Sequence, residues 1–144
     1  MSRRASAASG PLRRAGAVAL LGVGAVHLEE LTGDHYAAIP TIGTLFALNA
    51  AAAAAIAVAL WAPVGRVAHA LLAAAGIAVA AGSLVALVVS EQTTLFGFHE
   101  TGWRTPIVLA VVFEAATVVL LGAAVMATSA ESPPSRRPGD PRPA

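Results

Sequence analysis

Residues 23–49, VGAVHLEELTGDHYAAIPTIGTLFALN, decide the fold of this chain. An apolar stretch runs into a group of polar residues, turns near Gly33 and Pro40, and becomes apolar again. This apolar, polar, apolar pattern is typical of a membrane hairpin whose ionisable groups gather at one surface. The polar group consists of His27, Glu29, Glu30, Asp34, His35 and Tyr36.

The composition of the whole chain indicates that lipid is its solvent. Of 144 residues, 57% are hydrophobic and 12% are charged, and the mean hydropathy is +0.74. A soluble domain carries about a quarter charged residues. The absence of cysteine excludes disulfides and thiolate chemistry. The net charge of +1 gives no reason to expect nucleic acid as a partner.

The chain contains four apolar stretches, two of which form this hairpin, and each has roughly the length that crosses a bilayer as a helix. We expect spans at about residues 15–31, 39–62, 67–90 and 106–128. Residues 1–14 and 129–144 are rich in Arg, Ser and Pro, and they are predicted to be disordered cytoplasmic tails. Since lipid offers the backbone no hydrogen-bond partners, the sequence predicts an all-α integral membrane four-helix bundle.

Arginine placement predicts the orientation of this bundle. Eight of the nine basic residues, all arginines, lie in the two tails and at Arg66, between the second and third spans. By the positive-inside rule both termini are cytoplasmic, which describes a multi-pass protein of the cell membrane. The two outward loops then hold five of the eight acidic residues, and acids contribute little to that rule, so their clustering needs another reason.

The first apolar stretch also has an alternative interpretation as a signal peptide. It has a basic start, a short apolar core and a small-residue cleavage motif at Val23-Gly24-Ala25. The polar turn that follows, and the start of the next span at Pro40, favour a retained span instead.

Small residues predict close packing between the spans, because they let membrane helices approach one another. They are Gly16, Gly22 and Gly24, the alanine run 50–55, and Gly76, Ala80 and Gly82. A compact bundle with short connections follows.

Glu114 and His27 are the most informative ionisable residues. Glu114 lies about eight positions into the fourth span, so roughly 12 Å below its outer end. Ionisable groups at such depth face the bundle interior or a cavity. His27 can reach a similar depth and shares a helix face with Glu30. One interpretation is a direct His27–Glu114 hydrogen bond that fixes helix register; the other is a functional site.

Imidazole and carboxylate groups suit a divalent metal, so the candidate metal ligands are His27, Glu30, Glu114 and His99, with Glu100 as a further candidate. No HExxH or paired ExxH motif supports this set. Haem is disfavoured, because His69 lies at the cytoplasmic end and only His27 with His99 forms an arguable pair.

Other polar and aromatic residues receive simpler interpretations. Asn49, near the middle of the second span, is an intramembrane polar residue expected to hydrogen-bond across helices. Ser83 and Thr117 are expected to bond to their own helix backbone. An outer aromatic belt is predicted from Tyr36, Phe96, Phe98 and Trp103.

The two outer loops share an order of residues: His, Glu, Thr-Gly, aromatic, Pro. It begins at His27 in the first loop and at His99 in the second. Two helical hairpins related by duplication would produce this order, and so would chance.

Several of these segments resemble a known family. His27, His35-Tyr36, IPTIGTLFALN at 39–49 and LFGFHE at 95–100, followed by a span with Glu114, resemble an uncharacterised family of small four-span integral membrane proteins common in actinobacteria. The resemblance covers about residues 17–125 and implies four spans, with the first retained, and no assigned activity. The layout is also similar to that of DoxX-like membrane proteins, without a specific motif.

Three functional hypotheses follow, and the absence of phosphate loops and nucleophile motifs favours a non-enzyme. The preferred one is an accessory or interaction subunit, in a homo-oligomer or a larger membrane complex. The second is an outward-facing, membrane-embedded site for a metal, a proton or a small lipophilic ligand, built on His27, Glu30 and Glu114. The weakest is a redox subunit that carries haem or handles quinone.

Overall fold

The computed structural model describes residues 2–33 and 36–130, with side chains from residue 9 onward. The described chain forms α1 (Ser2–Thr32), the short 3-10 helix η1 (Tyr36–Ala38), α2 (Pro40–Ala59), α3 (Arg66–Gln92) and α4 (Thr105–Ser129). The four α-helices are long and apolar enough to cross a membrane, which confirms the prediction of an all-helical, multi-pass chain. Asp34, His35 and most of the predicted C-terminal tail lie outside the described residues.

The helix boundaries follow local sequence signals. Pro40 and Pro106 both lie in the first turn of their helices, where a missing N–H group costs no hydrogen bond. α1 begins at Ser2, so the segment predicted as a disordered tail is helical. Alanine and arginine are strong helix formers, and the helix continues through Pro11 into the span.

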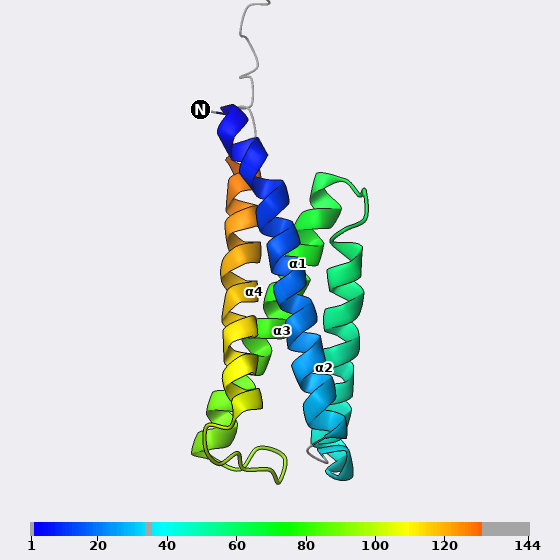
Figure 1. The fold of residues 1–144 in the computed structure, drawn as a ribbon, viewed down its shortest axis with the longest axis vertical. Helices are drawn as coiled ribbons and strands as arrows, with labels where there is room; N and C mark the ends of the chain where they lie inside the picture. The colour runs from blue at the N-terminus through cyan, green and yellow to red at the C-terminus, as the bar shows by residue number, and fades with distance from the viewer. Residues whose placement is uncertain (1, 34–35, 131–144) are drawn as a thin grey trace, which may run out of the picture.

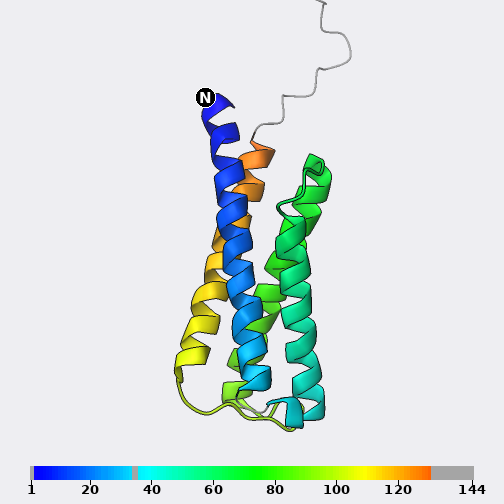
Figure 2. The same cartoon turned by 45° about the vertical axis from the view of Figure 1, so that its right-hand side comes forward.

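The bundle has two chemically different ends, visible in two views (Figures 1 and 2). The start of α1, the α2–α3 connection and the end of α4 lie together, and we call this the arginine end because it holds Arg13, Arg14 and Arg66. The α1–α2 and α3–α4 connections lie at the other end, which we call the acidic end because it holds Glu30 and Glu100.

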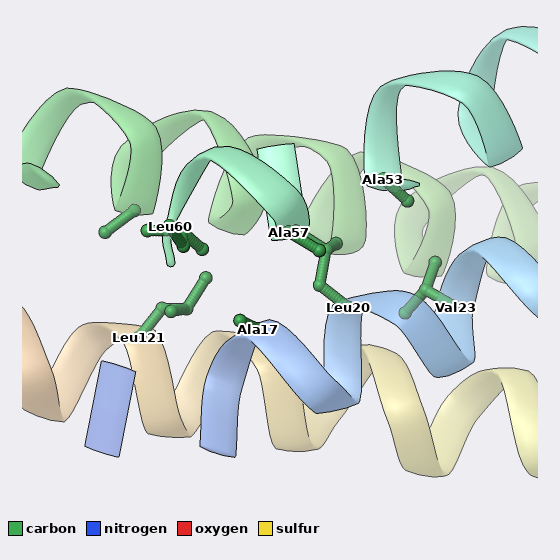
Figure 3. Close-up of a cluster of buried hydrophobic side chains, with 8 residues drawn as sticks. Ala17, Leu20, Val23, Ala53, Ala57, Leu60 and Leu121 are labelled. Carbon is green, nitrogen blue, oxygen red and sulfur yellow. The ribbon is translucent and has the colours of Figure 1, made fainter. Parts of the chain in front are cut away.

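The helices pack unevenly around α1. α1 runs along both α4 and α2, and α3 runs along α4, whereas α2 and α3 touch each other only sparsely. A cluster of buried apolar side chains fills the arginine half of the bundle (Figure 3). Its members are Ala17, Leu20 and Val23 of α1, Ala53 and Ala57 of α2 with Leu60 just beyond it, Ala73 of α3 and Leu121 of α4.

Glycines bring the helices together in this filled half, as predicted. A Cβ atom on Gly16 would lie 2.5 Å from a methyl carbon of Leu121, and one on Gly76 would lie 2.8 Å from the other. One glycine behaves differently from the prediction. A Cβ on Gly82 would have no described atom within 4 Å, because this part of α3 faces open space instead of a neighbouring helix.

The α3–α4 connection folds back over the acidic end through a tight turn. The backbone groups of Leu95 and Phe98 exchange hydrogen bonds of 2.7 and 2.9 Å, and the two residues between them, Phe96 and Gly97, both have positive φ. The Glu100 N–H then donates to the carbonyl of Ser90 at 3.1 Å. These bonds hold Glu100 close to the end of α3.

Candidate functional site

A chain of polar groups crosses the interior between α1, α3 and α4. The His27 Nδ1 donates to the Val23 carbonyl at 3.0 Å, and its Nε2 lies 2.9 Å from the Ser83 hydroxyl. Ser83 also interacts with the carboxyl group of Glu114, which is only 1% exposed. His27 and Glu114 therefore come together at one depth, as their sequence positions predicted.

The contact between them differs from the predicted direct hydrogen bond. His27 Nε2 and Glu114 Oε1 are 3.8 Å apart, which is too long for such a bond. Ser83 bridges them instead, so the expectation that its hydroxyl bonds to its own helix was wrong. The same expectation holds for Thr117, whose hydroxyl donates to the Phe113 carbonyl at 2.8 Å.

The bridge allows two arrangements of the same protons. In the first, Ser83 donates to a neutral His27 and accepts from a protonated Glu114. In the second, a protonated His27 donates to Ser83, which donates to the Glu114 carboxylate. A hydroxyl both donates and accepts, so the chain can pass a proton between imidazole and carboxylate.

A second polar cluster closes the acidic end, centred on Arg104. Its guanidinium Nη2 lies 3.3 Å from Glu30 Oε2 and 3.6 Å from Glu100 Oε2, and it donates to the Tyr36 hydroxyl at 2.7 Å. Tyr36 in turn donates to Glu100 at 2.9 Å. Glu30, Tyr36 and Glu100 are each less than a tenth exposed. We call these four residues the Arg104 cluster.

This cluster supplies a reason for two of the clustered acids. Glu30 in the last turns of α1 and Glu100 in the α3–α4 connection share Arg104, which immediately precedes α4. Burial and the hydrogen bond to Glu100 raise the pKa of Tyr36. Sequence reasoning missed the role of Arg104, although a lone arginine in a loop rich in acids was a signal for it.

Aromatic rings join the two polar groups. The Phe46 ring packs edge-on against His27 and against Tyr36, with ring centroids 5.1 Å apart in both pairs. Tyr36 meets Phe98 in the same way at 5.2 Å. Tyr36 is therefore buried, and the prediction that it belongs to an outer aromatic belt was wrong; Phe96 and Trp103 are exposed, at 62% and 65%.

A cavity of about 430 Å³ lies beside both polar groups, in the acidic half of the bundle. Its polar lining residues are His27, Glu30, Asn49, Ser83, Ser90, Glu100 and Glu114. Side chains from all four helices make the rest of the lining apolar, among them Val26, Ile42, Leu45, Phe46, Leu48, Val79, Leu87, Phe98 and Ile107. Small-molecule sites have this size and this mixture of apolar walls with a few polar groups.

The exposure of the lining residues shows where the cavity opens. Leu45 and Leu48 of α2 line it and are 45% and 61% exposed, and Gly82 and Ala86 of α3 line it and are also exposed. α2 and α3 make few contacts with each other. The cavity thus opens sideways between these two helices, while the Arg104 cluster, with its buried Glu30, Tyr36 and Glu100, covers its acidic end.

Two polar atoms in the cavity wall have no hydrogen-bond partner among the described residues. They are Oε2 of Glu114 and Oδ1 of Asn49, and both are buried. The cross-helix bond expected of the Asn49 amide is therefore not made through its oxygen. Buried polar atoms almost always have partners, so each such exception requires an explanation.

The candidate metal ligands are only partly brought together. His27 and Glu114 are neighbours, but Glu30 points to Arg104 and His99 is exposed. No group of three His, Asp or Glu side chains within the described residues could hold a metal ion. His99, the residue paired with His27 in the haem interpretation, is exposed and lies in the α3–α4 connection.

No protein-family model, curated protein or solved structure matches the chain.

Proposed function

We propose that the protein binds a small lipophilic molecule with one hydrogen-bonding head group, inside the acidic half of the bundle. The observation that carries this proposal is the 430 Å³ cavity, whose wall is mostly apolar and contains two polar atoms without a partner among the described residues. A head group that donates a hydrogen bond to Glu114 or Asn49 would satisfy them, and an apolar body would fill the rest.

The shape of the opening supports a ligand taken from the bilayer. The open side, between α2 and α3, is made of leucine, glycine and alanine, which a charged solute would avoid. The water-facing end is covered by the Arg104 cluster and the Tyr36 and Phe98 rings. A molecule dissolved in lipid meets the open side directly.

The same cavity favours a ligand site over the accessory-subunit hypothesis. If the His27–Glu114 region only fixed helix register, the space beside it would be filled with side chains, as it is around Leu20 and Leu121 in the arginine half. We further infer from the arginines that the arginine end faces the cytosol, with both termini inside, so that the ligand occupies the outer half of the membrane.

A photoreactive long-chain alcohol tests the proposal in vesicles that contain the protein. We expect it to label peptides of α2 and α3 that line the cavity, and we expect dodecanol to compete about tenfold better than dodecane, the value of one net hydrogen bond. Gly82→Leu should block the cavity and abolish the labelling. Val85→Phe adds bulk three residues away on the lipid-exposed side of α3 and is the control.

Two results would contradict the proposal. One is labelling spread evenly over lipid-facing residues such as Val85 and Val119. The other is equal competition by dodecanol and dodecane in a protein whose labelling still depends on Gly82, which would show a cavity without a polar specificity. The double variant Asn49→Leu with Glu114→Met, which leaves no hydrogen-bonding group at either position, should remove the preference for the alcohol while retaining the labelling.

A further inference from the structure

A second cavity, of about 560 Å³, lies at the arginine end between the start of α1, the start of α3 and the last turns of α4. Arg13, Arg66 and His69 line it. None of the described residues that line it is acidic. This site is distant from the ligand cavity, and the inference below does not depend on the proposed function.

The two arginines are held in different ways. The Arg66 guanidinium donates to the backbone carbonyl of Thr128, which ties the first turn of α3 to the last turn of α4. Arg13 Nε is buried and has no hydrogen-bond partner within residues 9–33 and 36–130. A guanidinium has five N–H donors in a fixed fork, so one bond to a carbonyl leaves Arg66 with donors to spare.

Most of the remaining lining residues are apolar, and Ser9, Thr128 and Ser129 add hydroxyl groups. Ala70, Ala73, Ala124 and Val125 line it, and Ala73 and Ala124 are 2% and 5% exposed. Two cationic groups therefore stand at the end of the spans, above a surface of small apolar side chains that continues into the membrane. An amphiphile with an anionic head and a hydrocarbon chain fits this arrangement better than a free ion does.

We propose that this cavity binds the phosphate group of an anionic membrane lipid, with the head between Arg13 and Arg66 and one acyl chain along the alanines. Arginine forks match the oxygens of phosphate, and charge-assisted hydrogen bonds of this kind are the strong ones. Basic pockets between helices on the cytoplasmic side are also where lipid head groups are recognised. The chain offers a built-in control, because Arg14 lies outside the cavity, stacked on Trp61 at 5.6 Å.

Native mass spectrometry of the full chain in detergent, with added phosphatidylglycerol or phosphatidylcholine, tests this proposal. We expect retained phosphatidylglycerol at a much lower concentration than phosphatidylcholine. Arg13→Gln should weaken phosphatidylglycerol binding at least fivefold, and Arg14→Gln, which removes the same charge, should change it less than twofold. Ala70→Leu should weaken it as well, without altering any charge.

Three results would overturn the proposal. Equal losses in Arg13→Gln and Arg14→Gln would show a diffuse attraction to the arginine end. Displacement of the lipid by millimolar inorganic phosphate, with Ala70→Leu unaffected, would show a site for the free anion. Equal retention of the two lipids would show an annular contact with no head-group recognition. Because Arg66→Gln also removes a contact to α4, the conclusion depends on Arg13 and Ala70, neither of which is bonded to α4.

Discussion

At the scale of single residues, Ser83 decides how the two buried ionisable groups meet. It lies on α3, between an imidazole on α1 and a carboxyl on α4. Its hydroxyl can donate to one and accept from the other in both proton arrangements, which no apolar side chain could do. The polar chain through the bundle therefore depends on one hydroxyl group.

Removal of that hydroxyl should be costly. In Ser83→Ala, His27 Nε2 loses its partner inside the bundle, and we expect a loss of about 1–3 kcal/mol, the cost of an unsatisfied buried polar group. Thr117→Val is the matched control, because the Thr117 hydroxyl bonds only to its own helix. Thermal unfolding in detergent gives both values. Equal losses in the two variants would contradict the bridging role.

Tyr36 provides a residue-level prediction about pH. Its pKa is raised in the folded protein by burial and by its hydrogen bond to Glu100. Above the ordinary phenol value of about 10, the unfolded chain therefore loses this proton before the folded protein does, and the stability that Tyr36 contributes below that pH declines as the pH rises.

The chain has a single tyrosine, so the change in ultraviolet absorbance that accompanies tyrosinate formation reports Tyr36 alone. At a pH where a free phenol is half ionised, we expect almost no tyrosinate signal from the folded protein, and about half of the full signal after unfolding at the same pH. The stability of Tyr36→Phe should fall less steeply over the same range. A phenol that titrates normally in the folded state would show that Tyr36 is not buried as described.

At the scale of elements, hydropathy was enough to predict four helices, because each span depends on its own composition. The partners of each side chain were not predictable in this way. His27 and Ser83 are 56 positions apart in the chain, and Tyr36 and Arg104 are 68 apart. Such contacts depend on how the helices turn toward one another, which a single sequence with no periodic charge pattern does not specify.

The two connections at the acidic end show that a similar residue order can lead to different environments. Both reach their prolines and start a helix, as their shared residue order predicted. Their aromatic residues nevertheless have different environments, since Tyr36 is 8% exposed and Trp103 is 65% exposed. His27 lies in a helix, and His99 lies in a connection. The shared order therefore does not produce equivalent sites.

The Arg104 cluster joins α1, η1, the α3–α4 connection and the start of α4, so its loss should loosen one whole end of the bundle. Arg104→Gln leaves the carboxylates of Glu30 and Glu100 buried without their cation, and we expect a loss of about 2–3 kcal/mol. Hydrogen exchange should increase in η1 and in the α3–α4 connection, and much less in α2 beyond Asn49.

A triple variant tests whether the stability lost in Arg104→Gln comes from the unpaired carboxylates or from the changed shape of the side chain. When Glu30→Gln and Glu100→Gln are added to Arg104→Gln, no charge is left unpaired, and most of the lost stability should return. Arg14→Gln is the control for the removal of an exposed arginine at the other end and should have little effect. If the triple variant were less stable than Arg104→Gln alone, the cluster would not be an ionic one.

At the scale of the whole molecule, the buried apolar core lies toward the arginine end, and the two cavities lie in the acidic half and at the arginine end. Glycine, alanine and leucine close the arginine half, where α1 and α4 are in direct contact. In the acidic half, the cavity lies between α2 and α3, which make few contacts with each other. The helices are joined there by the polar chain of His27, Ser83 and Glu114 and by the Arg104 cluster. The buried apolar core thus lies nearer the arginine end, and the proposed site for a lipophilic ligand lies in the acidic half. The position of each in the membrane depends on which end of the bundle faces the cytosol.

That orientation can be measured directly, because the chain contains no cysteine. We expect Thr94→Cys, at the exposed acidic end, to react with an impermeant thiol reagent on intact cells, and Val64→Cys, at the exposed arginine end, to react only after the cells are opened. The unmodified chain controls for background. The reverse pattern would place the basic cavity away from the anionic cytoplasmic leaflet, and it would remove one reason to expect an anionic lipid there. The ligand cavity would remain accessible from lipid in either orientation, but its opening would then lie in the inner half of the membrane.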